Sequence, residues 1–152
     1  MRAIVQRVTS ASVTIGDRTV GHIDRGLLVF VGVEQGDGPP DVQYIAGKVR
    51  DLRVFEDPSE SSRHLNRSVQ DVGGGVLVVS QFTLAADCRK GRRPSFDAAA
   101  DPPIAKPLYE EVARELQASG LTVATGEFQA MMQVELVNDG PVTILIDSTK
   151  QF

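Results

Sequence analysis

The stretch L-L-V-F-V-G-V, residues 27–33, is an almost unbroken apolar run. A short run without polar alternation is typical of a strand that is buried on both of its faces. Residues 2–23 instead alternate between polar and apolar side chains, and Gly16-Asp17 interrupts them with a turn signal. This pattern predicts an antiparallel meander that leads into the buried strand.

Two later segments have the spacing of a helix face rather than that of a strand. The first begins at Pro39-Pro40, where prolines suit a first helical turn, and its apolar stripe ends at Leu52. Gly47 inside it costs about 1 kcal/mol relative to alanine. The second has its stripe between residues 108 and 116. Because Pro107 would remove a helical hydrogen bond, we expect this helix to begin near Lys106 or to be kinked.

The remaining apolar runs predict further strands, and residues 56–68 predict a polar loop. Residues 76–79 form a short buried strand, and residues 121–125, 130–137 and 142–146 give the last strands, with the final two joined as a hairpin by Asn138-Asp139-Gly140. The order of elements predicts the α/β class: one domain, residues 1–152, of mixed, largely antiparallel β-sheets with two main helices packed on them.

Composition and charge narrow the classes of function. A single cysteine, Cys88, allows no internal disulfide, and with two histidines there is no metal-ligand spacing, so we expect no metal and no cofactor. The net charge of -4 argues against a protein that coats nucleic acid, although it leaves room for a local basic contact. The N-terminal residues alternate like a strand rather than a signal peptide, which predicts a cytoplasmic protein.

Ser80, Gln81, Phe82 and Thr83 are the first candidate site, because they follow a buried strand at its carboxyl end. Successive side chains of a strand point to opposite faces of the sheet, so all four residues can line one pocket only if the strand bends or ends there. The alternative is an ordinary strand end with hydroxyls in solvent. A hydroxyl nucleophile needs a neighbouring base, and neither histidine lies in a motif that would supply one.

Arg89, Lys90, Arg92 and Arg93 form the second candidate site, because four cations lie within five positions. Arginine forks bind phosphates through paired hydrogen bonds, so the segment suits a phosphate-rich ligand. The alternative is a solvated surface loop.

The third candidate is Gly140-Pro141, which follows the turn signal. A proline there can blunt the pairing of a sheet edge. An X-Pro bond can also be cis, which aims neighbouring carbonyls in a direction that the trans form does not reach. The residues leave both interpretations open.

Five segments together resemble the D-aminoacyl-tRNA deacylase family across almost the whole chain. The S-Q-F-T-L and N-D-G-P-V-T motifs are the most specific. The segments are I-V-Q-R-V-T-S-A-S-V (residues 4–13), V-L-V-V-S-Q-F-T-L-A-A-D (76–87), K-G-R-R-P-S-F (90–96), T-G-E-F-Q-A-M-M (125–132) and N-D-G-P-V-T (138–143). Gln129 stands where the family usually has glycine, and Leu65 stands where methionine is common.

The resemblance implies a homodimer that hydrolyses the ester between a D-amino acid and the 3′ end of tRNA. Residues 80–83 would line the pocket for the terminal adenosine and the aminoacyl group, and Met132 and Asn138 would belong to that pocket. Gly140 and Pro141 would be the Gly-cis-Pro element that one subunit inserts into the pocket of the other. Its rigid carbonyls would exclude L residues and admit glycine.

Because neither histidine lies in a motif that would supply a general base, two schemes for the hydrolysis of the ester are considered. Backbone N-H groups around Phe82 and Thr83 would stabilise the oxyanion while the ribose 2′-hydroxyl helps to activate water. The rival scheme uses Thr83 as a covalent nucleophile. From a different class of function, a non-catalytic dimer that binds tRNA would use the cations of residues 89–93 equally well.

Overall fold

The computed structural model describes residues 1–57, 59 and 65–151, which contain one six-stranded mixed sheet. The strands follow the order β2-β1-β3-β6-β7, and β8 pairs with β1 as well. β1 is antiparallel to β2, β3 and β8, whereas β3, β6 and β7 are parallel to one another. The strands are β1 (Arg2–Ile15), β2 (Arg18–Ile23), β3 (Gly26–Gly32), β6 (Gly75–Ser80), β7 (Thr122–Thr125) and β8 (Gln133–Asp147). The mixed, largely antiparallel sheet is therefore confirmed.

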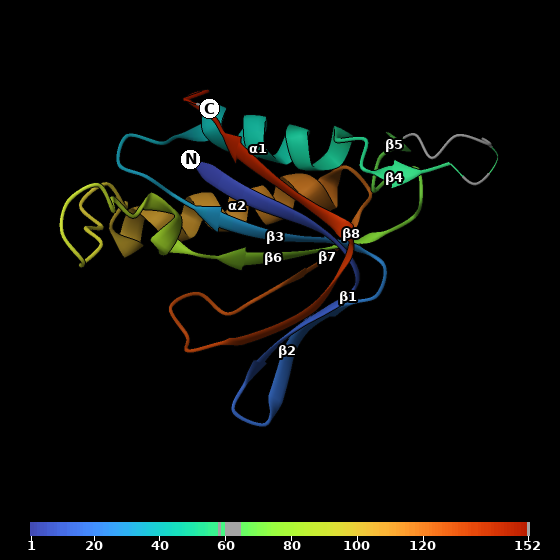
Figure 1. The fold of residues 1–152 in the computed structure, drawn as a ribbon, viewed down its shortest axis with the longest axis horizontal. Coiled ribbons are helices and arrows are strands. Elements are labelled where there is room, and N and C mark those ends of the chain that lie inside the picture. The colour runs from blue at the N-terminus through green and yellow to red at the C-terminus, as the bar shows by residue number, and fades with distance from the viewer. Residues whose placement is uncertain (58, 60–64, 152) are drawn as a thin grey trace.

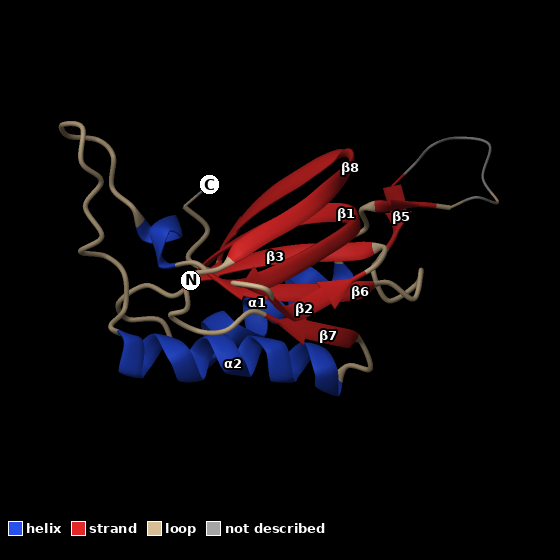
Figure 2. Cartoon of the chain, turned by 90° about the horizontal axis from the view of Figure 1, so that it is seen from below, coloured by secondary structure: helices blue, strands red, loops and turns tan. Residues whose placement is uncertain are grey.

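Two helices, α1 (Pro39–Asp51) and α2 (Pro102–Ala118), cover one face of this sheet, as Figures 1 and 2 show. Val42, Ile45 and Val49 are fully buried, which confirms the predicted stripe of α1. Of the two alternatives for α2, a start near Lys106 is wrong, and a kink at Pro107 stays a prediction. The helix begins at Pro102, because prolines are tolerated in a first turn where the N-H has no intrahelical partner, and it continues through Pro107. None of the helices in the described part of the chain has the length and hydropathy needed to cross a bilayer.

β3 is buried on both faces, as the apolar run predicts. Leu27, Val29 and Val31 belong to the core between the sheet and the helices. Leu28 packs in a second core on the opposite face, together with residues of β1, β2 and β6. Because the strand is covered on both sides, the parallel partner β6 is held along its whole length, from Gly26↔Gly75 to Val31↔Ser80.

The second core is enclosed because the sheet curls until β2 approaches β7, which gives the sheet its barrel-like form. Gly21 in β2 marks the closest approach: a Cβ added there would lie 2.6 Å from the carbonyl oxygen of Thr125. Any larger side chain would therefore push the two strands apart.

The predicted terminal hairpin is wrong, because residues 133–147 form one continuous strand along β1. Pairing is irregular only around the N-D-G-P-V-T motif: Val8 pairs with Asn138 and Gln6 with Thr143. The amide of Val142 donates to the side chain of Asn138 at 2.9 Å, so the motif forms a bulge instead of a turn. The local turn signal is overridden because β1 is long enough to pair with both halves of β8.

The predicted polar loop of residues 56–68 is also partly wrong. Its ends form a small antiparallel pair, β4 (Phe55–Glu56) and β5 (Leu65–Arg67). Phe55 is fully buried and the guanidinium of Arg25 lies 5.3 Å from the centre of its ring. His64 lies outside the described residues.

We predict that Gly21→Ala destabilises the protein by about 1–3 kcal/mol, because the added methyl group overpacks the contact between β2 and β7. Gly47→Ala is the matched control: a Cβ at Gly47 meets no atom within 4 Å, and alanine favours the helix by about 0.5–1 kcal/mol. Urea denaturation of both variants measures the two changes. Equal effects of the two substitutions would contradict the closure of the sheet at Gly21.

Candidate functional site

The segment of residues 80–83 begins where β6 ends. Ser80 is the last residue of the strand, Gln81 is extended, and Phe82 starts the short 3-10 helix η1 (Phe82–Ala85). The amide of Gln81 donates to the carbonyl of Val31 at 2.8 Å, which ties the junction to β3. Because the strand ends at Ser80, its alternation does not separate the four residues onto two faces.

The amides of Phe82 and Thr83 lie ahead of the first hydrogen bond of η1. That bond runs from the amide of Leu84 to the carbonyl of Gln81, at 3.2 Å. Within the described residues, neither amide donates to another backbone group. Phe82 and Thr83 are exposed residues, and the first amides of a helical turn have no partner within the turn, so both N-H groups are candidates for donors to a ligand.

Within one chain, His22 lies too far from Ser80 and Thr83 to act as their base. Its neighbour Ile23 contacts Gly75, the first residue of β6, whereas Ser80 is the last. At a rise of about 3.3 Å per residue, the two ends of β6 lie roughly 16 Å apart. His22 instead lies 3.9 Å from Asp24 on the surface of β2.

Met132 lies beside the carboxyl end of β6, and its place in a substrate pocket stays a prediction. It packs against the second core that contains Val79. A Cβ added to Gly126 would lie 2.8 Å from its sulfur, and the amide of Gly126 donates to the carbonyl of Val78 at 3.0 Å. The structure thus brings Met132 within a few residues of Ser80.

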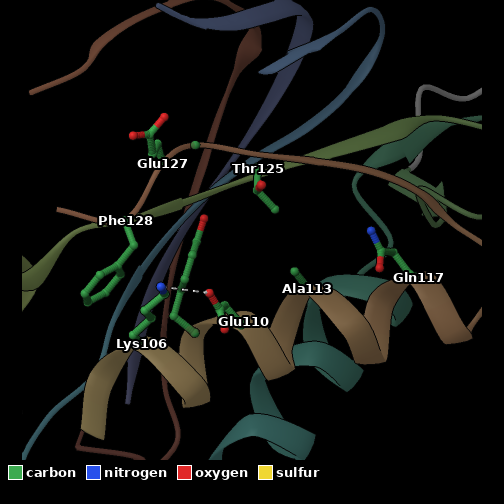
Figure 3. Close-up of a pocket in the computed structure, with 9 residues that line it drawn as sticks. Lys106, Glu110, Ala113, Gln117, Thr125, Glu127 and Phe128 are labelled. Carbon is green, nitrogen blue, oxygen red and sulfur yellow. Dashed lines mark ion pairs between the residues drawn. The ribbon is translucent and has the colours of Figure 1, made fainter. Parts of the chain in front are cut away.

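A groove runs between α2 and residues 125–128, next to this same end of β6 (Figure 3). It encloses about 500 Å³. Figure 3 shows Lys106 and Glu110 on α2, joined by an ion pair of 3.8 Å, with Thr125 and Phe128 on the other wall. Its residues are Lys106, Tyr109, Glu110, Ala113, Gln117, Thr125, Gly126, Glu127 and Phe128. Residues 80–83 do not line it.

Tyr109 connects this groove to β6. Its hydroxyl donates to the carbonyl of Val78 at 2.9 Å. Burial, with a smaller contribution from Glu110, raises the pKa of Tyr109 to about 12. The hydroxyl therefore stays protonated at neutral pH, so it acts as a fixed hydrogen-bond donor. The aromatic wall continues to Phe128, whose ring centre lies 6.0 Å from that of Tyr109.

Gly140 and Pro141 lie in the bulge of β8, and the peptide bond between them is cis. The bulge is held by Arg7, a buried arginine that the sequence analysis did not single out. Its Nε donates to the carbonyl of Asp139 at 3.0 Å and lies 3.2 Å from the carboxylate of the same residue. Its Nη1 donates to the carbonyl of Val54 at 2.6 Å. Asn138 also supports the bulge, through Val142 and the hydroxyl of Thr143.

Within one chain, Gly140-Pro141 and residues 80–83 are not brought together. The bulge lies level with Arg7, which pairs with Leu27, and Leu27 pairs with Val76, four residues before Ser80. β1 and β3 also stand between β8 and β6. With a rise of about 3.3 Å per residue and a strand spacing of about 4.8 Å, the two groups are roughly 20 Å apart.

The cationic segment forms a loop beyond η1 that projects past the end of β6 (Figure 1). A bridge between Asp87 and Ser95 closes it, and Arg89 binds Asp87 through Nε at 2.9 Å and Nη2 at 2.6 Å. The hydrogen bonds from Arg89 hold the pKa of Asp87 well below its usual range. In the described part of the chain, no carboxylate lies within 4.0 Å of Lys90, Arg92 or Arg93. These three exposed cations are available to a ligand, whereas Arg89 shapes the loop.

Comparison with known proteins gives matches over the full chain. The family model described as D-Tyr-tRNA(Tyr) deacylase matches residues 4–147. D-aminoacyl-tRNA deacylases of Syntrophotalea carbinolica and Koribacter versatilis are 60% and 59% identical over 152 residues, which is 100% of both chains in each case.

Two solved structures share the fold. One, titled c-Myc DNA Unwinding Element Binding Protein, is 40% identical, with a TM-score of 0.89 over 97% of this chain and 98% of that chain. The other, of a probable eukaryotic D-amino acid tRNA deacylase, is 16% identical, with a TM-score of 0.81 over 95% and 97%, and shows the fold alone. The match of residues 4–147 and the identity over the whole length establish that the chain belongs to the D-Tyr-tRNA(Tyr) deacylase family.

Proposed function

We propose that this protein hydrolyses the ester bond between a D-amino acid and the 3′ end of tRNA, in the cytoplasm and without a cofactor. The observation that carries the proposal is the 60% identity, over the full length, to a relative named D-aminoacyl-tRNA deacylase. The geometry supports it, because the exposed residues Phe82 and Thr83, whose amides donate to no backbone group in the described residues, and the cationic loop both follow β6. An acyl-transfer site and a phosphate-binding loop would thus lie next to each other.

In the proposed reaction, water attacks the ester carbonyl and the amides of Phe82 and Thr83 stabilise the oxyanion. In other enzymes, loss of one such donor costs roughly 3–4 kcal/mol. The tetrahedral intermediate then expels the ribose oxygen, which takes up a proton, and the D-amino acid and tRNA are released. The ribose 2′-hydroxyl assists the attacking water, since neither histidine supplies a base by its sequence context. Ser80 and Gln81 line the same pocket.

A second copy of the chain completes the site in this proposal. The roughly 20 Å between Gly140-Pro141 and residues 80–83 excludes a joint contact with one aminoacyl group inside a single chain. Val137 and Leu145, on the same strand as the bulge, are 56% and 60% exposed. Apolar side chains on such a strand suit a homodimer that carries the bulge of one subunit to the pocket of the other.

Selection between mirror images follows from this arrangement. The carbonyls around Gly140 and Pro141 bind the amino group of the substrate and leave no space for an L side chain, whereas a D side chain points elsewhere. Glycine has no side chain to reject. Gly140 itself is constrained, because its φ is +129° and an added Cβ would lie 2.9 Å from Nη2 of Arg7.

The tRNA contacts are divided between the loop and the groove. Lys90, Arg92 and Arg93 bind phosphates of the acceptor end, and Arg89 keeps the loop in shape through Asp87. The groove beside Phe128 has the volume of a small-molecule site and one aromatic wall, which suits the terminal adenosine. Met132 does not line this groove; it packs against the second core, beside Gly126.

The first prediction concerns the substrates. Incubation with D-tyrosyl-tRNA, glycyl-tRNA and L-tyrosyl-tRNA should release amino acid from the first two and leave the third intact, because only an L side chain meets the carbonyls of the bulge. Acid-gel analysis of charged tRNA measures each rate. The relative titled as a DNA-binding protein suggests nucleic-acid binding without hydrolysis as the rival function. A non-catalytic binder would release neither tyrosine enantiomer.

The second prediction separates the two chemical schemes. Thr83→Ala should keep most of the turnover, since it retains the backbone N-H, whereas complete loss with intact tRNA binding would favour the covalent scheme. Phe82→Pro should lower kcat by about 10²–10³ relative to Phe82→Ala, because both variants lack the ring but only proline lacks the donor. Proline suits this first helical position, and Gln81 before it is already extended. Equal kcat values for the two Phe82 variants would contradict the backbone scheme.

The third prediction concerns the cationic loop. Reversal of charge in either single variant, Arg92→Glu or Arg93→Glu, should raise KM far more than it lowers kcat, because phosphate contacts far from the ester are equal in the ground state and transition state. Arg114→Glu on the surface of α2 serves as a control with the same change in net charge. An unchanged KM would show that the loop does not bind phosphate.

A further inference from the structure

Phe82 and Phe96 form an aromatic pair on the surface at the end of β6. Their ring centres are 5.0 Å apart and their planes meet at 67°, which is an edge-to-face arrangement. The rings remain accessible, since Phe82 is 56% and Phe96 is 37% exposed. Neither residue belongs to the two hydrophobic cores. Their exposure therefore has no explanation in the packing of the fold.

The pair joins two segments that the proposed function uses separately. Phe82 is the first residue of η1, and its amide is one of the two donors that the proposed ester site uses. Phe96 follows the cationic loop, one residue after the bridge of Ser95 to Asp87, and its carbonyl accepts the amide of Ala99 at 2.9 Å. The aromatic surface thus lies between the phosphate-binding cations and the reacting end of the substrate.

The charge around the pair favours an anionic partner. Residues 86–97 carry four basic side chains and two acidic side chains, Asp87 and Asp97, a net charge of +2 on a protein whose total is -4. An accessible aromatic face next to exposed cations is the combination by which proteins bind single-stranded nucleic acid: bases stack on the rings and the backbone follows the positive charge.

We infer that Phe82 and Phe96 form a stacking platform for an unpaired base of the single-stranded RNA that precedes the terminal nucleotide. This inference rests on the proposed function, because it assigns a place to the nucleotides between the phosphates on the loop and the adenosine in the groove. The edge contact from Phe96 holds the ring of Phe82, so one face of the pair stays open to the base. Phe96 is thus a residue that binds and positions the substrate rather than a catalytic residue.

The test uses Phe96→Leu, which keeps an apolar side chain and removes the ring, and Phe96→Tyr, which restores it. The probe is a short single-stranded RNA with the sequence of the tRNA 3′ end and 2-aminopurine at one of its last four positions. Stacking on an aromatic ring quenches this fluorophore. With the wild-type protein we expect quenching when 2-aminopurine occupies one of the positions that precede the terminal nucleotide. This quenching should be lost with Phe96→Leu and retained with Phe96→Tyr.

Kinetics provides the second measurement. One base stack is worth about 1–3 kcal/mol, so Phe96→Leu should raise KM for D-tyrosyl-tRNA by about 5- to 150-fold, with a smaller change in kcat. Phe96→Tyr should restore the wild-type KM. Normal folding of both variants is checked by their thermal unfolding temperatures.

Each outcome has one meaning. Equal KM and equal quenching in wild type and Phe96→Leu overturn the stacking platform while deacylation of D-tyrosyl-tRNA still supports the proposed function. If neither the wild-type protein nor any variant releases D-tyrosine, the proposed function is wrong. The stacking platform is then tested by the quenching assay alone: loss of quenching in Phe96→Leu supports it, and unchanged quenching overturns it. Equally strong quenching with the DNA version of the probe would overturn the assignment to RNA, because the platform would then serve single-stranded nucleic acid in general.

Discussion

The hydrogen bonds of Arg7 are the contact on which the proposed selectivity depends. β1 and β8 pair along their whole length except at the bulge, and the guanidinium of Arg7 is bound there to the carbonyls of Val54 and Asp139. A buried guanidinium needs partners for its donors, so its position fixes the backbone that provides them. Gly140 and Pro141, which follow the residue that Arg7 binds, are exposed.

The end of β6 is fixed by a different constraint. β3 is covered by the helices on one face and by the second core on the other, and its parallel pairing with β6 continues to Ser80. The residues that follow therefore leave the sheet at a defined point, where the amide of Gln81 is bound to Val31. One sheet thus presents the two proposed parts of the site at separate places, and the proposed twofold arrangement of chains would join them.

The sequence predicted those features that depend on burial and failed where distant segments compete. The apolar run at residues 27–33 and the stripe of α1 are confirmed because burial follows directly from apolar spacing. The turn signal at residues 138–140 led to the wrong prediction of a hairpin, because the strand that pairs with this segment, β1, lies more than a hundred residues earlier in the chain. Arg7 was missed because an arginine in an alternating strand has the pattern of a surface residue. The groove was missed because α2 and residues 125–128 meet only after folding.

One departure from the family gains a physical reason from the structure. Gln129 stands where the family usually has glycine, and its φ of +63° lies in the left-handed region. Glycine adopts this conformation at little cost, whereas other L residues lose about 1–2 kcal/mol. The left-handed backbone at Gln129 would therefore suit the glycine that the resemblance leads us to expect at this position.

The most direct test of the account asks whether one site is built from two chains. Phe82→Pro and Gly140→Ala each disable one half of the proposed site, and the two variants are mixed, unfolded and refolded together before D-tyrosyl-tRNA is added. If the bulge of one chain serves the pocket of the other, each mixed dimer has one intact site, and random pairing should restore about a quarter of wild-type activity. Activity no higher than that of the separate variants would show that the site lies within a single chain, and would contradict the account.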